Sequence, residues 1–132
     1  MSDLAAICGE CRRVVADGDG YLCVRFGDIR RYWSEKAEWE EAHPGSMHRL
    51  AEILTMPDEI TWRVYHVRCD PLDGLDSYQI DVERIRTWRQ LARWTSDLMA
   101  KNWLAHSDWD HLLRGIADDR GTRLVAVQAR AA

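Results

Sequence analysis

Alternating apolar and polar side chains mark short stretches in the first half of the chain. Residues 12–15 (RRVV) and 21–26 (YLCVRF) predict two strands, with a tight turn at 17–20 (DGDG) between them. Residues 61–67 (TWRVYHV) predict a third strand. Because successive side chains of a strand point to opposite faces, one face of 21–26 carries Leu22, Val24 and Phe26, and the other carries Tyr21, Cys23 and Arg25.

Helical signals lie between the second and third of these strands. Residues 34–43 (SEKAEWEEAH) predict a short helix that has Ser34 as its N-cap and ends at the Pro-Gly pair 44–45. Residues 46–54 predict a second short helix, which ends before the sequence MPDE. We expect residues 34–57 to be an insertion within a single domain that spans residues 1–132.

The second half of the chain is dominated by helical spacing. Residues 81–104 predict a long helix with Asp81 as its N-cap, and one broad apolar face carries Ile85, Trp88, Leu91, Ala92, Leu98 and Met99. The sequence SDWD at 107–110 is typical of a capping box before another helix, whose apolar stripe is Trp109, Leu112, Leu113, Ile116 and Ala117. Gly121 ends this helix, and residues 122–129 predict a final strand.

Composition and charge limit the class of protein. The chain has 132 residues, 46% of them apolar and 30% charged, which is enough apolar content for a packed core. Its net charge of −4 argues against a non-specific nucleic-acid coat. The N-terminus lacks the pattern of a signal peptide, and no apolar run is long enough to cross a bilayer, so we expect a cytoplasmic protein without a membrane partner.

Four residues with metal-ligand spacing are the strongest chemical signal. Cys8 and Cys11 (CGEC) have a two-residue gap, and so do His66 and Cys69 (HVRC). Three thiolates and one imidazole are a common ligand set for structural zinc. Residues 12–65 lie between the two pairs, a longer gap than the roughly 15–20 residues of the commonest paired pattern, but loop-closure entropy rises only slowly with length. We expect one structural zinc ion held by these four side chains.

Other interpretations of these residues remain open at this point. The two pairs can be unrelated turns with a hydrogen-bonded His66, or Cys23 can join the other cysteines in an iron–sulfur cluster. A catalytic zinc would need an open position and a base such as Glu10 or Asp70. We favour the structural ion because signatures of metalloproteases, P-loop proteins and zinc deaminases are absent from the sequence.

The order of the predicted elements, strands first and helices afterwards, predicts an α+β fold. We expect a small zinc-stabilised N-terminal β-hairpin region that packs against a helical C-terminal half. On the predicted long helix, Arg86, Arg89 and Arg93 form a stripe opposite the apolar face. This stripe is a candidate contact for phosphate or a partner, and its alternative is a solvated helix face.

Several segments, taken in order, carry a resemblance: CGECRRVV, WRVYHVRCDP, YQIDVERIRT and WTSDLMAKNWLAHSDWDHLL. Together they resemble small uncharacterised zinc-motif proteins of actinobacterial phages and prophages, over roughly residues 8–114. The resemblance implies a phage context rather than a chemistry. We expect a small binding or regulatory module that acts through a host or phage protein, or through nucleic acid. The alternative is a small metal-dependent hydrolase or nuclease that uses Glu10, Asp70 or Asp73.

Overall fold

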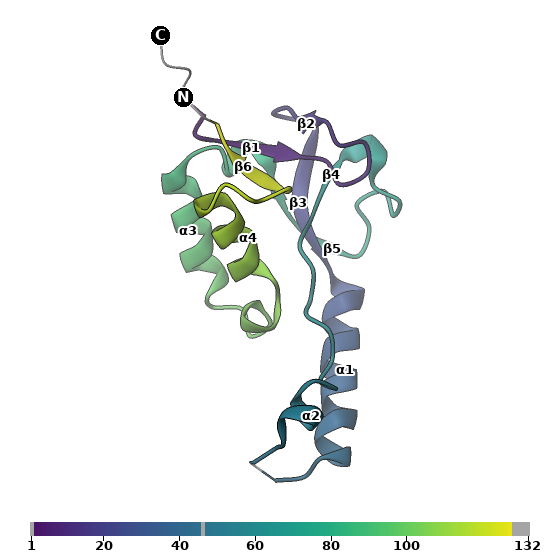
Figure 1. Ribbon diagram of the computed structural model, residues 1–132. Coiled ribbons are helices and arrows are strands. Elements are labelled where there is room, and N and C mark those ends of the chain that lie inside the picture. Colours follow the sequence, from purple (N-terminus) through teal and green to yellow (C-terminus); the bar gives the residue numbers. More distant parts are fainter. Residues whose placement is uncertain (1, 46, 128–132) are drawn as a thin grey trace.

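Two small antiparallel sheets, a pair of packed helices and a projecting helical arm make up the protein (Figure 1). The computed structural model describes residues 2–45 and 47–127. The strands are β1 (Leu4–Ile7), β2 (Val14–Val15), β3 (Gly20–Arg25), β4 (Arg63–His66), β5 (Ser77–Asp81) and β6 (Leu124–Ala126). The α-helices are α1 (Phe26–Ala42), α2 (Leu50–Ile53), α3 (Trp88–Leu98) and α4 (Trp109–Ala117), with short 3₁₀ turns η1 (Val67–Cys69), η2 (Val82–Arg84) and η3 (Leu104–His106). The predicted α+β class is confirmed.

The strands on either side of the DGDG turn belong to different sheets. One sheet has the order β2-β1-β6 and the other has the order β4-β3-β5. Strand β2 therefore pairs with β1, with Ala6 opposite Val15, and β3 pairs with β4, with Gly20 opposite His66. The sequence did not predict β1, whose buried Leu4 and Ala6 alternate with half-buried neighbours. The N-terminal hairpin is thus β1–β2, and the turn at 17–20 links two sheets.

Both faces of β3 are covered, and its side chains divide between the two faces as the alternation predicts, with the exception of Phe26. Leu22 and Val24 face the main core, whereas Cys23 packs with Tyr21 and Tyr65 in a second, smaller cluster. Phe26 departs from the prediction, because it begins α1 and is 40% exposed. At the start of the strand, a Cβ on Gly20 would lie 2.1 Å from the Tyr65 carbonyl oxygen, so only glycine fits there.

The predicted helix over 81–104 is wrong at both ends. Its first residue, Asp81, is the last residue of β5, which pairs with β3 and places Ile80 opposite Leu22 in the core. Pairing with β3 overrides the local helical spacing, and η2 follows. Helix α3 begins only at Trp88, where Thr87 and Gln90 form a capping box in place of the predicted Asp81 cap. It ends at Leu98, and Met99 is 73% exposed.

Trp62 is the centre of the main core. It is fully buried, lies against Trp103 and Trp109, and donates its indole N–H to Ser107 at 3.1 Å. Asp108 accepts the backbone N–H of Trp62 and pairs with Arg123 at 2.7 Å. Ser107 and Asp108 therefore bind the strand segment rather than forming the predicted capping box, and α4 has no side-chain cap. The predicted strand at 122–129 is β6, and its last two residues lie outside the described part.

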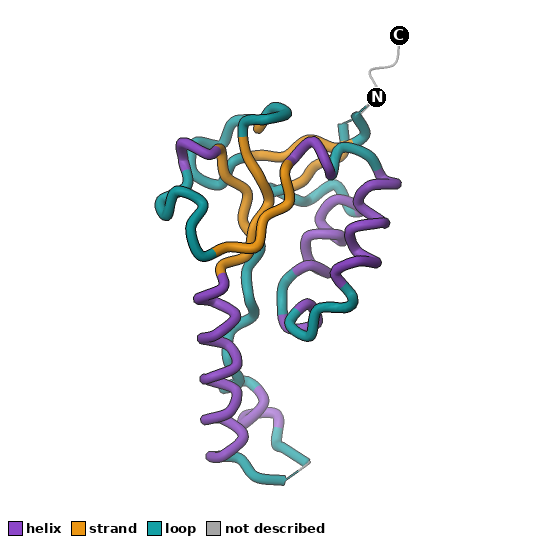
Figure 2. Tube along the Cα trace, turned by 180° about the vertical axis from the view of Figure 1, so that it is seen from behind, coloured by secondary structure: helices purple, strands orange, loops and turns teal. Residues whose placement is uncertain are grey.

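An arm formed by α1, α2 and the described residues between them extends away from the sheets (Figures 1 and 2). Helix α1 has 17 residues and begins at Phe26, so Ser34 lies within it and is not its N-cap. Asp76 accepts the N–H of Gly27 and pairs with Arg30, which fixes the first turn to the loop before β5. Most of the predicted insertion, 34–57, lies in this arm. The predicted second helix, 46–54, shortens to α2, and residue 46 lies outside the described residues.

No helix in the described ranges has both the length and the apolar character required to span a membrane.

Candidate metal centre

The two predicted half-sites come together where the β1–β2 hairpin meets the end of β4. Cys8 follows β1, Cys11 lies in the turn before β2, His66 is the last residue of β4, and Cys69 ends η1. One ligand atom from each of these four residues lies within 4.8 Å of all the others. The structure therefore brings together every residue of the predicted set, and the four could hold one metal ion.

Backbone hydrogen bonds shape the first half-site and attach it to the second. Cys8 donates its N–H to the Arg13 carbonyl at 2.9 Å, and Arg12 donates back to the Cys8 carbonyl at 3.0 Å. Arg12 adopts a left-handed conformation with φ 63°, which lets the chain turn sharply after Cys11. The N–H of Gly9 bonds the Val64 carbonyl at 2.8 Å, so the turn is held against β4. We call this turn, residues 8–13, the knuckle.

The imidazole of His66 is oriented for metal binding. Its Nε2 lies 3.2 Å from the carbonyl oxygen of Val14, which can only accept a hydrogen bond, so Nε2 carries the proton. The unprotonated Nδ1 then faces the thiols, 3.3 Å from Cys11 Sγ and 3.9 Å from Cys69 Sγ. A carbonyl that fixes the tautomer of a ligating histidine is a usual feature of metal centres.

The pKa values of two of the thiols, Cys8 and Cys69, are shifted in opposite directions. Burial alone would raise the pKa of Cys8, but the backbone N–H groups of Cys11, His66 and Glu10 outweigh it and lower the pKa to about 6. Burial and the neighbouring sulfurs of Cys8 and Cys11 raise the pKa of Cys69 to about 11. Several thiolates in one place repel each other, and a cation among them removes that repulsion. The donor set therefore fits a positively charged ion.

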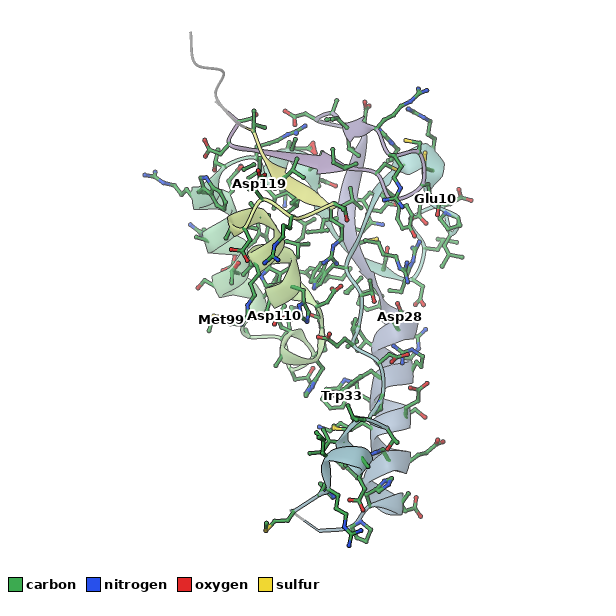
Figure 3. All side chains as sticks on the ribbon, in the orientation of Figure 1. Glu10, Asp28, Trp33, Met99, Asp110 and Asp119 are labelled. Carbon is green, nitrogen blue, oxygen red and sulfur yellow. The ribbon has the colours of Figure 1, made fainter. Side chains whose placement is uncertain are left out.

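Protein encloses the centre on its inner side. Cys8 is fully buried and His66 is 3% exposed, whereas Cys11 and Cys69 are half-buried. Glu10 lies in the knuckle but is exposed, and Figure 3 shows it on the outer side of the molecule, on the knuckle. The side chains of the four candidate ligands thus converge on the centre, whereas Glu10 lies on the outer side of the knuckle.

Asp70, the residue after Cys69, is committed to a buried network. Its carboxylate accepts from the Tyr21 hydroxyl and from both terminal nitrogens of Arg25. It also accepts the N–H groups of Leu72 and Gly74, each at 2.9 Å. Burial opposes ionisation, but Arg25 and then Tyr21 outweigh it and lower the pKa of Asp70 to about 2. Both oxygens are occupied, so Asp70 is no candidate for a catalytic base.

This network has a structural consequence for the metal centre. Arg25 and Tyr21 belong to β3, so Asp70 ties the segment after Cys69 to the middle strand of the second sheet. The guanidinium of Arg25 also lies over the Tyr65 ring, 5.4 Å from its centre. The sequence alone suggested only that Asp70 could be a catalytic base. Its role depends on Arg25, which is distant in sequence, and no local pattern reveals that contact.

Cys23 lies apart from the metal centre. It is fully buried on the other face of β3, beside Tyr21 and Tyr65, where burial raises the pKa of its thiol to about 12. The described geometry therefore does not support the four-cysteine cluster that the sequence left open. Cys23 is instead a buried thiol on the second face of β3.

The predicted arginine stripe is interrupted. Arg86 precedes α3 and pairs with Asp17 at 2.6 Å, and it also donates to the Val15 carbonyl at 3.0 Å. Arg86 thus holds the turn between the sheets. Arg89 and Arg93 do lie on α3, where both are exposed and line a groove with Trp94. Only these two remain free for a phosphate or partner contact.

A second group of polar side chains, Glu59, Asp110 and His111, also lies close together. His111 is 3.3 Å from Glu59, and all three residues are exposed. Solvated groups of this kind attract each other weakly without an ion, so we assign no site to them.

Comparisons with protein-family models, with curated proteins and with solved structures found no match. Function has to be inferred from the geometry of the metal centre and of the surfaces around it.

Proposed function

We propose that Cys8, Cys11, His66 and Cys69 hold one structural zinc ion, and that the chain is a zinc-stabilised binding module that acts through a protein partner. The observation that carries this proposal is the closed ligand set, in which His66 is fixed by Val14 and faces three cysteine sulfurs. Such a centre joins the two sheets. Its four protein ligands would leave no coordination position of the ion open for substrate.

Zinc is the metal that this donor set favours. Three thiolates and one imidazole form a usual tetrahedral zinc site, whereas iron–sulfur clusters favour four thiolates and calcium or magnesium favour oxygen ligands. The ion would connect the knuckle with the end of β4, two segments that are far apart in sequence. Its binding energy would therefore appear largely as folding energy.

A binding role is favoured over catalysis because the nearby carboxylates are unsuited to act on a metal-bound water. Asp70 is buried in its pair with Arg25, and Glu10 is exposed on the outer side of the knuckle. A small metal-dependent hydrolase or nuclease remains the alternative, and Glu10 and Asp73 are the residues that it would use.

A protein partner is favoured over nucleic acid by charge and surface. The net charge is −4, and Arg86, one of the three candidate phosphate contacts, is already paired with Asp17. By contrast, exposed apolar side chains such as Leu50, Leu54 and Trp88 suit contact with protein. From the resemblance to actinobacterial phage proteins we carry over the proposal that the module works in the cytoplasm of a phage host.

Two assays separate these functions. The zinc-loaded chain is incubated with nucleic acid and ester substrates and added divalent metals, beside Glu10→Ala and Asp73→Ala. We expect no turnover, and cleavage that either substitution abolishes would establish the hydrolase alternative instead. Crosslinking in a host lysate, followed by mass spectrometry, should identify one protein repeatedly. Recovery of nucleic acid alone, or of nothing reproducible, would contradict the proposal.

A further inference from the structure

A groove along α3 gathers three arginines that have no ion-pair partner in the described ranges. We call it the arginine groove, and its volume is about 340 Å³. Its lining residues are Arg84, Arg89, Gln90, Arg93, Trp94 and Asp97. All three arginines are exposed. Six other arginines of the described chain pair with a carboxylate, whereas the groove arginines carry charge that no ion pair neutralises.

Two of these arginines occupy unfavourable positions on the helix. Arg89 lies in the first turn of α3, where the helix dipole favours acidic side chains, yet that turn contains none. Arg93 follows four residues later, so the two guanidinium groups lie on the same side of the helix and repel each other. An anion bound beside them would offset both effects.

Trp94 supplies the groove with an apolar wall and a hydrogen-bond donor. Its side chain is half-buried and packs against the main core, which fixes its position. Its indole N–H has no partner among the described residues, and no buried polar side-chain atom there lacks one, so this N–H reaches solvent. Gln90 is fixed as well, because its amide accepts the N–H of Thr87 and donates to the Glu83 carbonyl. The groove therefore joins a fixed apolar wall to three cationic side chains.

These features fit a short acidic peptide segment better than a nucleic-acid strand. Guanidinium groups bind carboxylates through paired hydrogen bonds, and the Trp94 ring offers a surface for an apolar side chain. A nucleic-acid strand would bring a continuous run of phosphates past Asp97, which lines the same groove, and toward a chain of net charge −4. A short peptide segment can place its carboxylates beside the arginines alone.

We propose that the arginine groove is the surface at which the module binds its protein partner. It takes a short acidic segment whose carboxylates meet Arg84, Arg89 and Arg93, while a neighbouring apolar side chain rests on Trp94. The inference rests on the proposed binding role, and it adds to that role a surface and the chemistry of the partner.

The groove is separate from the metal centre. Figure 3 shows Glu10 of the knuckle and Met99, which follows α3, on opposite sides of the molecule. None of the four candidate metal ligands lines the groove. Substitutions in the groove should therefore leave the metal bound and the fold intact.

Fluorescence anisotropy with a labelled peptide tests the groove. The probe is a short fluorescein-labelled peptide in which glutamates alternate with leucines, titrated with the zinc-loaded chain. We expect saturable binding that weakens as salt is added. The groove variant, Arg89→Glu with Arg93→Glu, should bind about tenfold more weakly or worse, because like charges then face each other. The matched control is Arg114→Glu, which reverses an exposed arginine of α4 that does not line the groove and should bind as the wild type does.

Two further probes identify the chemistry that binds. A peptide with glutamine in place of every glutamate should bind about tenfold more weakly, because the guanidinium groups then lose their counter-charges. A single-stranded DNA oligonucleotide of equal net charge should bind more weakly than the glutamate peptide. Arg89→Gln with Arg93→Gln, which removes both charges without reversing them, should show the loss of the groove variant to a smaller degree. Metal content and melting temperature are measured on each variant and should match the wild type.

Three results would overturn the inference: equal affinity of the groove variant and the wild type, no binding of the glutamate peptide to the wild type, or tighter binding of the oligonucleotide. None of them would refute the proposed function, which fails instead if the lysate experiment recovers no protein. A partner that the wild type and the groove variant recover equally would overturn this inference and leave the proposed function standing.

Discussion

Replacing Asp70 with alanine tests how the segment after Cys69 is held. The substitution removes a carboxylate that accepts five hydrogen bonds: two from Arg25, one from Tyr21 and two from backbone N–H groups. It leaves the guanidinium of Arg25, a residue that is only 8% exposed, without its counter-charge. Breaking a buried ion pair in this way typically costs about 3–5 kcal/mol.

The measurement is urea unfolding of the zinc-loaded chain at neutral pH, followed by the fluorescence of its tryptophans. Glu35→Ala is the control, because it breaks the partly exposed pair with Arg31 on α1. A pair of that kind is worth about 0.5 kcal/mol. The double variant Arg25→Met with Asp70→Leu should be more stable than Asp70→Ala, because it leaves no unpaired buried charge. A loss for Asp70→Ala within about 1 kcal/mol of that for Glu35→Ala would refute the reasoning.

Three further predictions concern the core and the centre. Cys8→Ser should lose the metal and lower the melting temperature, whereas Cys23→Ser should keep full metal content, as elemental analysis and thermal scans will show. Gly20→Ala should destabilise the chain by about 1–3 kcal/mol in urea, because its Cβ would collide with the Tyr65 carbonyl. Burial, and after it the charge of Lys36, lower the pKa of His106 from its ordinary value of 6.5. When the protein unfolds below pH 6.5, His106 therefore takes up a proton. Stability should therefore fall as the pH drops through that range, less so in His106→Asn.

The sequence contained the four residues of the candidate metal centre but not the contacts that surround them. Spacing alone identified Cys8, Cys11, His66 and Cys69, because two-residue gaps are a local property of turns. The partners that orient the site come from distant segments: Val14 for the imidazole, and Arg25 for the residue after Cys69. Such contacts exist only after folding, and a single sequence does not encode them in any local pattern.

The difference between local patterns and contacts that form only on folding also explains the errors in the predicted fold. Alternation placed β3 and β4 correctly, but β1 was missed because its buried Leu4 and Ala6 lie in a run of small apolar residues that looks like a tail. Residues 81–87 have helical spacing, yet β5 ends at Asp81 and η2 follows, because pairing with β3 buries Ile80 and Val82. Tertiary pairing decides such cases against local preference.

The metal content of the purified chain tests the central claim most directly. Native mass spectrometry of protein expressed without added metal should give one zinc ion per chain. The thermal stability of that chain should fall when a chelator removes the ion. A folded chain that carries no metal, and whose melting temperature is unchanged by chelation, would contradict the assignment of Cys8, Cys11, His66 and Cys69 as a structural zinc centre.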